Sequence, residues 1–132
     1  MRAWLQKHDL SSEEFDISDA TSAKKVLRDF DWQCELNRQA QAISETCPPG
    51  LGLVTEGGEI LHICPGNDGR CIVHFHFSST RKLFGLFSRR VDLVKTFTHV
   101  SLDKTRQMID AFFVRDFESI KRMALTNRCN QR

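Results

Sequence analysis

The chain has 132 residues, which is enough for one domain and too few for two domains with separate cores. Forty per cent of the residues are apolar and 27% are charged, as in an ordinary globular protein, so a disordered or fibrous chain is excluded. No apolar run reaches the ~20 residues of a membrane-spanning helix, and residues 1–9 lack the apolar stretch of a signal peptide. We therefore expect a single domain over residues 1–132, located in the cytoplasm.

Charge is distributed unevenly along the sequence, although the net charge is only +2. Residues 1–31 hold five basic and seven acidic side chains, and residues 32–79 hold two basic and five acidic ones. Residues 80–106 hold seven basic and two acidic side chains, a local net charge of +5. This asymmetry predicts differently charged faces, and it suits a charged protein partner at least as well as nucleic acid.

Cysteine usage favours a reducing compartment. The number of cysteines is odd, and they are spread widely without a CxxC pair, at positions 34, 47, 64, 71 and 129. A secreted disulfide framework normally has an even number in a smaller, loop-rich chain. We expect free, buried thiols.

The first part of the chain has the pattern of two helices. A Ser-Asp-Ala-Thr-Ser cluster suited to capping opens a helix over residues 18–30. Asp31 is placed to cap a second helix, which the Cys-Pro-Pro-Gly run at 47–50 ends. Helical spacing predicts that one stripe of this second helix lies in the core: Trp32, Leu36, Ala40 and Ile43. Residues 3–7 fit either an edge strand or a short helix.

The middle of the chain has the two-residue period of β-strands. Residues 51–55 and 59–64 flank a glycine turn and predict a hairpin. A second turn signal at 65–69 leads into a strand over 70–77, and residues 91–100 predict a fourth strand. Because the loops are short, we expect neighbouring strands to pair antiparallel, as in a meander.

The last part of the chain is helical again. Ser101 is placed to cap a helix, a break follows near residues 115–116, and a short helix covers 117–123. We expect one stripe of the longer helix in the core, formed by Leu102, Thr105, Ile109 and Phe112 and widened by Met108 and Phe113. This order predicts an α+β domain, with an antiparallel meander sheet of about four strands and the N-terminal and C-terminal helices mainly on one face. The other face is then open to solvent or to a partner.

Three histidines and one cysteine alternate with apolar residues on the predicted β-hairpin. Strict alternation places His62, Cys64, His74 and His76 on one face, with His62 opposite His74 if the loop is 67–69. We interpret this face as a polar, partly exposed surface, with no metal or other cofactor bound. The alternative is a tetrahedral zinc site of three imidazoles and one thiolate, which requires four ligands to converge from a flat sheet.

Residues 81–90 combine basic side chains with an apolar centre. The basic residues are Arg81, Lys82, Arg89 and Arg90, and the aromatic ones are Phe84 and Phe87. We expect an inter-strand connection that turns the two phenylalanines inward while the charges stay in water. The alternative is protein recognition through an exposed phenylalanine with a basic rim. Nucleic-acid binding is not expected, because no established nucleic-acid-binding motif accompanies the patch.

The sequence carries no catalytic signature. It contains neither a P-loop nor a GxGxxG motif, and neither a GxSxG motif nor a zinc-deaminase pattern. We therefore expect a protein that is not an enzyme and that has no small-molecule substrate. The alternative from the enzyme class is a small metal-dependent or thiol enzyme centred on the histidine–cysteine face.

Four patterns follow one another within about residues 20–125. Residues 27–32 lead into a helix, residues 52–64 and 71–77 form compact hairpins, and residues 97–103 lead into a helix that ends at 112–117. This order resembles the small immunity proteins of bacterial polymorphic-toxin and contact-dependent inhibition systems. The resemblance implies a non-enzymatic cytoplasmic protein that binds one cognate toxin domain and blocks its active site. It assigns no role to any single residue.

The predicted function is therefore a protein-binding inhibitor that occludes a cognate toxin or effector protein. The predicted contact set is His62, His74 and His76 on the sheet, with Arg81, Arg89 and Arg90 beside it. An adaptor or secretion chaperone for an effector is the alternative within the binding class. No membrane contact is expected.

Overall fold

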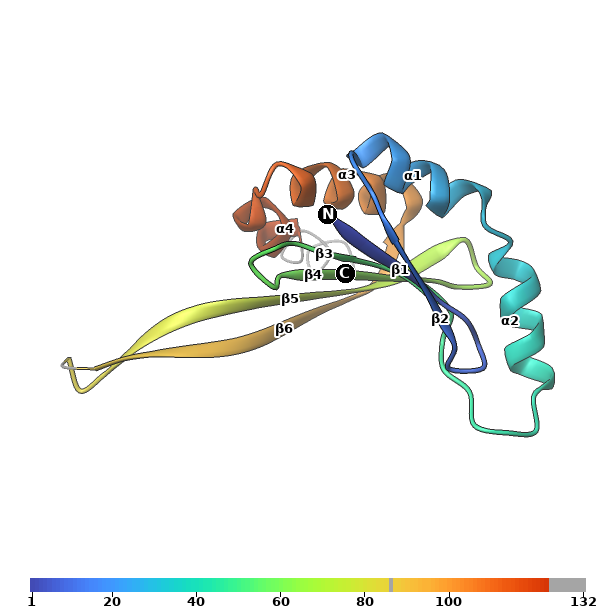
Figure 1. The fold of residues 1–132 in the computed structure, drawn as a ribbon, viewed down its shortest axis with the longest axis horizontal. Coiled ribbons are helices and arrows are strands. Elements are labelled where there is room, and N and C mark those ends of the chain that lie inside the picture. Colours follow the sequence, from blue (N-terminus) through green and yellow to red (C-terminus); the bar gives the residue numbers. More distant parts are fainter. Residues whose placement is uncertain (86, 124–132) are drawn as a thin grey trace, which may run out of the picture.

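Six antiparallel strands form one sheet in the computed structural model, which describes residues 1–85 and 87–123 (Figure 1). The strand order is β2-β1-β3-β4-β5-β6. The strands are β1 (Arg2–Gln6), β2 (Ser12–Asp16), β3 (Gly50–Val54), β4 (Ile60–Pro65), β5 (Arg70–Leu83) and β6 (Phe87–Ser101). The helices are α1 (Ala20–Asp29), α2 (Trp32–Gln41), α3 (Leu102–Phe113) and α4 (Phe117–Met123).

The predicted α+β class and antiparallel sheet are confirmed, but the prediction of about four strands is wrong. The two additional strands come from the first sixteen residues. β2 has Phe15 as its only apolar side chain, because it is an edge strand with little core to cover. β1 is an interior strand, since it pairs with β2 on one side and β3 on the other. The two open alternatives for residues 3–7 are thus resolved in favour of a strand, although not an edge strand.

Side-chain caps start three of the helices where the sequence contains short polar residues. Asp19 accepts a hydrogen bond from the Ser22 backbone N–H at 2.7 Å, and Asp31 accepts one from Cys34 at 3.0 Å. Ser101 caps α3 by accepting from the Lys104 N–H at 3.2 Å. Each such cap is worth about 1 kcal/mol. Within residues 1–85 and 87–123, no helix has both the length and the apolar character needed to cross a membrane.

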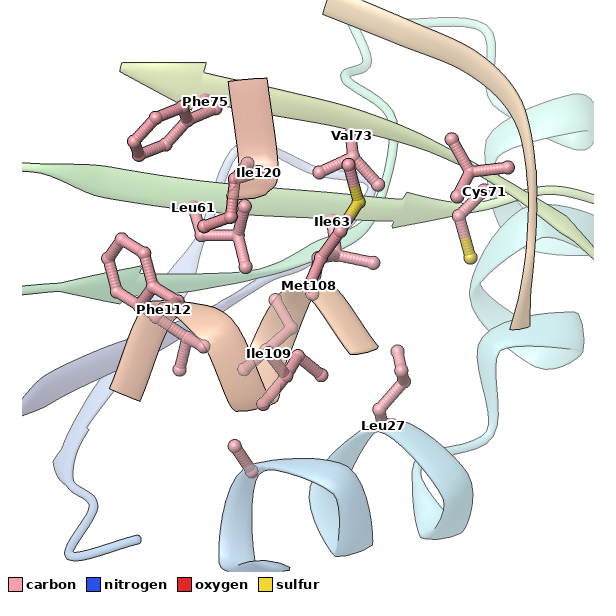
Figure 2. Close-up of a cluster of buried hydrophobic side chains, with 14 of the residues drawn as sticks. Leu27, Leu61, Ile63, Cys71, Val73, Phe75, Met108, Ile109, Phe112 and Ile120 are labelled. Atoms are coloured by element: carbon pink, nitrogen blue, oxygen red, sulfur yellow. The ribbon is translucent and has the colours of Figure 1, made fainter. Parts of the chain in front are cut away.

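The core lies between the sheet and the helices α1, α3 and α4 (Figure 1). Strands β4 and β5 contribute every second residue, and α3 contributes the facing layer (Figure 2). The largest side chains in it that are fully buried include Phe75, Leu61, Ile63, Ile109 and Phe112. Phe75 meets the ring of Phe112 edge-on, with centroids 6.3 Å apart. Burying side chains of this size stabilises the fold by about 1.5–3 kcal/mol each.

The prediction of a core stripe on the second helix is wrong. α2 ends at Gln41, so Ile43 lies beyond the helix and is fully exposed, and Ala40 is exposed as well. Trp32 packs against the core only in part, and its Nε1–H donates to the Leu27 carbonyl at 2.7 Å. α2 stands at the end of the sheet rather than on its face, so only its first turn approaches the core (Figure 1).

The predicted stripe on α3 is correct at its centre and wrong at its ends. Met108, Ile109 and Phe112 are buried. Leu102 is 39% exposed because it is the first residue of the helix, at the edge of the contact between the helix and the sheet. Phe113 is half-buried. Thr105 is buried, as the stripe predicted, and its hydroxyl donates to the Ser101 carbonyl at 2.9 Å.

A buried carboxylate attaches α2 to the β1–β2 turn. Glu35 is 4% exposed and accepts hydrogen bonds from the His8 backbone N–H at 3.1 Å and from the Arg38 guanidinium at 3.1 Å. The His8 Nδ1 lies 2.7 Å from the same carboxylate. Burial alone would raise the pKa of Glu35, but these hydrogen bonds and the neighbouring positive charges outweigh it, so the pKa lies below its ordinary value.

Replacing Glu35 by Gln removes this buried charge without changing the side-chain volume. Because the folded state lowers the pKa, the contribution of Glu35 to the free energy of unfolding is complete above its ordinary pKa of 4.5. It is lost as the pH falls from there through the lowered folded-state pKa. We expect Glu35→Gln to lower the free energy of unfolding by about 1–3 kcal/mol at neutral pH and by progressively less in acid. Urea denaturation across this pH range measures the difference.

The matched control is Glu45→Gln, which changes an exposed carboxylate and should leave stability within about 0.5 kcal/mol of wild type. A loss from Glu35→Gln that stayed constant from neutral pH into acid would contradict the role assigned to the buried charge.

Candidate functional site

The antiparallel register of β4 and β5 places histidines opposite one another on the face away from the helices. His62 lies directly opposite His74, and Cys64 lies opposite Ile72, as the sequence predicted. His76 is two pairs further out on the same face, opposite Ile60. The core residues Leu61, Ile63, Val73 and Phe75 alternate with these side chains and point to the other face. The helices α1, α3 and α4 lie on the other side of the sheet (Figure 1), and α2 approaches the histidine side through Leu36, which lines a pocket with Cys64 and Ile72.

Three of the four predicted zinc-ligand candidates come together. One ligand atom from each of His62, Cys64 and His74 lies within 4.8 Å of the other two. The Cys64 Sγ is 3.7 Å from the His62 Nε2, and the two imidazole centroids are 5.8 Å apart. His76 is not part of this group. The three residues are called the His62–Cys64–His74 cluster below.

Two glycines of β3 make room for this cluster and its neighbour. A Cβ at Gly50 would lie 2.7 Å from the His62 Nε2 and 3.2 Å from the Cys64 Sγ. A Cβ at Gly52 would overlap the Trp4 ring, which lies across that strand with its centroid 5.9 Å from the His62 ring. The bare backbone of β3 therefore lets one imidazole, one thiol and one indole lie flat against the sheet.

Burial sets the protonation of the cluster. It lowers the pKa of His62 to about 4, helped by the nearby charges of His74 and His76, and it also lowers the pKa of His74. The pKa of the Cys64 thiol rises to about 11, again mainly by burial. At neutral pH both imidazoles therefore present a free lone pair, while Cys64 retains its proton. A neutral imidazole beside a protonated thiol does not form the thiolate–imidazolium pair of a cysteine nucleophile.

The second candidate region is a two-stranded arm formed by β5 and β6. β5 has no partner in β4 beyond the pair Ile60–His76, so from Phe77 to Leu93 the two strands pair only with each other. We call this segment the β5–β6 arm. It projects far from the body of the molecule (Figure 1). Seven residues of β5 extend past His76, a length of roughly 20 Å.

The phenylalanines at the arm tip are exposed, so the expectation that they turn inward is wrong. Phe84 is 96% exposed and Phe87 is 71% exposed. They lie at the turn between β5 and β6, at the distal end of the arm, where none of the described helices or other strands covers them (Figure 1). Leu86, the remaining apolar residue of the turn, and Cys129 lie outside the described residues. The four described cysteines are free thiols, as predicted, but only Cys64 and Cys71 are buried, and Cys34 and Cys47 are half-buried.

The predicted basic contact residues divide between the two faces of the arm. Arg81 and Arg89 form a cross-strand pair with the same alternation as the core residues Phe75 and Phe97. Arg90 lies opposite Thr80, on the histidine side, and its guanidinium reaches the Gly57 carbonyl at 3.5 Å. The six residues of the predicted contact set therefore do not form one face: His62, His74, His76 and Arg90 share one side, and Arg81 and Arg89 lie on the other.

Charge on the distal arm is positive and unneutralised. The segment 80–91 holds four cationic side chains and no carboxylate. All four are exposed, and among the described residues none of them forms an ion pair. The base of the arm is different, because α4 supports it there: the Lys121 ammonium lies 4.5 Å from the Phe77 ring centroid, and Phe77 stacks on Phe75 at 5.1 Å.

Sequence reasoning missed a cavity of about 370 Å³ between α1, the start of α2 and the β4–β5 turn. Its lining includes Trp32 and several basic residues drawn from separate elements, so no local pattern indicates it. Three of those cations are already neutralised: Lys24 by Asp110 at 2.6 Å, Arg28 by Asp29 at 2.8 Å and Arg106 by Asp103 at 2.9 Å. This cavity therefore has less unsatisfied charge than the arm.

The arm tip holds a phenylalanine in an unfavourable backbone conformation. Phe84 has φ +54° and Gly85 has φ +69°, both in the left-handed region that only glycine, asparagine and aspartate adopt readily. We expect Phe84→Asn to raise the free energy of unfolding of the hairpin by about 0.5–1 kcal/mol, because the exposed ring makes no contact that is lost. Hydrogen exchange of the β5–β6 amides, compared with wild type, measures the gain.

The control is Phe87→Asn, which lies in extended strand and should bring no such gain. Equal or lower protection in Phe84→Asn would show that the Phe84 backbone stores no strain.

Comparison of the chain with protein families, with curated proteins and with solved structures finds no match.

Proposed function

We propose that this protein is a non-enzymatic inhibitor of the immunity type, which binds a cognate protein and occludes it with the β5–β6 arm. The observation that carries the proposal is the exposure of Phe84 and Phe87 at the end of the arm, whose described residues pack against the core only at its base, through Phe77. A protein gains no stability from a large apolar side chain held in water, and Phe84 also has a costly backbone conformation.

The composition of the tip is that of an interface centre. Aromatic residues and arginine are the side chains most enriched at the energetic centres of protein interfaces. On the arm they occur together, with Phe84 and Phe87 flanked by Arg81, Arg89 and Arg90. An aromatic side chain enters a partner's pocket, while the arginines contact its polar rim.

The charge of the arm supports a partner with an acidic surface. Four unpaired cations on the distal segment favour a partner with an acidic surface, and opposite charges accelerate the encounter between two proteins. The slender shape favours a concave target, because a two-stranded ribbon roughly 20 Å long enters a cleft that a flat sheet face cannot enter. An enzyme active site with acidic walls has both properties.

The test combines capture of the partner with an assay of its activity. Tagged wild-type protein and two arm variants, Phe84→Asn and Arg81→Glu/Arg89→Glu, are used to capture proteins from cells that express the chain natively. We expect one stoichiometric partner with wild type. For the purified pair, Phe84→Asn should weaken binding roughly 30-fold, the loss of a typical hot spot. The charge reversal should slow association and reduce its dependence on salt.

The matched control is Ile43→Ser, because Ile43 is as exposed as Phe84 but lies outside the arm. It should bind like wild type. Full-strength binding by both arm variants would exclude the arm as the contact surface. A partner that remains active in the complex would exclude inhibition and favour an adaptor or secretion chaperone. Capture that nuclease treatment abolishes would show that nucleic acid, rather than protein, occupies the arm.

A further inference from the structure

We propose that the His62–Cys64–His74 cluster is a three-ligand binding site for a divalent transition metal, with zinc as the expected ion. The cluster lies on the sheet face away from the helices and is built from two strands, which makes it independent of the arm and of the function proposed for it. In this cluster one thiol and two imidazoles lie together without a carboxylate.

The spacing of the ligand atoms is close to what tetrahedral zinc requires. Bonds of about 2.3 Å to sulfur and about 2.0–2.1 Å to nitrogen put tetrahedral ligand atoms about 3.4–3.6 Å apart. The Cys64 Sγ and the His62 Nε2 are 3.7 Å apart, and no pair in the cluster exceeds 4.8 Å. Side-chain rotation has to move the more widely separated ligand atoms by about 1 Å to reach these distances, and the strands do not have to move.

The pairing of the strands holds the ligands in place before any ion binds. His62 and His74 are a directly opposed cross-strand pair, and Cys64 is two residues from His62 on the same face. Gly50 leaves room for two of the ligand atoms, because any side chain there would fill the space that the His62 Nε2 and the Cys64 Sγ now share. The opposed histidines and the space at Gly50 bring the three ligand atoms together without a further ligand from a distant loop.

A hydrogen bond to β6 selects which nitrogen of His74 is left to bind the ion. The Thr96 Oγ1 on β6 lies 3.0 Å from the His74 Nδ1. When Nδ1 carries the proton it donates to this hydroxyl, and Nε2 is left as the free ligand. Histidines that bind metal almost always have such a partner for their second nitrogen, and its loss typically weakens binding 10–100-fold.

The donor set determines which ions fit. Imidazole and thiolate together suit zinc and neighbouring transition metals, whereas magnesium and calcium require oxygen ligands. Binding replaces the S–H bond of Cys64 with a metal–sulfur bond and releases one proton to solvent. The ion then carries three protein ligands, and its fourth position remains for water or a small ligand.

The experiment uses untagged, metal-free full-length protein titrated with Zn²⁺ in competition with a chromophoric chelator. We expect one ion per chain. His74→Ala should weaken binding by more than 100-fold, and Thr96→Val by roughly 10–100-fold while leaving all three ligands in place. Titration with Co²⁺ should give a tetrahedral spectrum with a thiolate charge-transfer band that Cys64→Ser lacks.

Two controls separate this site from general binding by surface histidine and cysteine. Cys34→Ser changes a half-buried thiol on α2, and His99→Asn changes a histidine at φ +57°, a conformation that asparagine tolerates. Both should bind Zn²⁺ like wild type. Because Cys64 is buried and its variant can lose folding, the decisive comparison is His74→Ala, which changes a partly exposed residue. Equal Zn²⁺ affinity in wild type and folded His74→Ala, or no stoichiometric binding by wild type, would overturn the proposal.

Discussion

The antiparallel register between β4 and β5 decides which side chains enter the core and which reach the opposite face. Because the side-chain period of a strand is two, the pair His62–His74 and the pair Ile63–Val73 are consequences of the same register. A slip of one residue would bury the histidines without partners and expose Leu61 and Phe75 to water. The hydrophobic free energy of the core therefore also fixes the geometry of the histidine cluster.

The two faces of the sheet satisfy different demands on one backbone. On the helix side, large side chains such as Phe75 and Phe112 fill the space between layers. On the other side, Gly50 and Gly52 omit side chains altogether, so that His62, Cys64 and Trp4 lie against bare strand. Glycine weakens a strand, so two of them in β3 are compensated by the packing on the helix side. The arm has no such compensation, since an unsupported two-stranded ribbon is only marginally stable in water. Its exposed aromatic tip and unpaired cations are the features on which the proposed contact with a partner rests.

Prediction from the sequence succeeded where a local pattern has a single physical cause. Alternation along residues 60–77 gave the faces and the register of the central hairpin, and short polar residues gave the helix caps. It failed where burial has no local signature. β2 carries one apolar residue, and the outer halves of β5 and β6 carry no alternating apolar pattern, because neither covers a core. The apolar spacing of α2 suggested a buried face, yet that helix stands at the end of the sheet and buries Glu35 instead.

The sequence by itself determined the α+β class, the antiparallel pairing of the central strands and the opposition of His62 to His74. The class follows from periods of two and 3.6 residues, the pairing from short loops, and the opposition from alternation together with a turn at 67–69. Only the tertiary structure decided that His76 stays outside the cluster and that Gly50 leaves the space for it. It also placed the Thr96 hydroxyl, from a third strand, within hydrogen-bond distance of His74. It also decided that Phe84 and Phe87 end an arm in solvent rather than a buried connection. The reason is that the exposure of a side chain, and its approach to others, depend on which elements lie alongside it in space. Spacing along the chain does not encode how far two paired strands extend beyond the rest of the sheet.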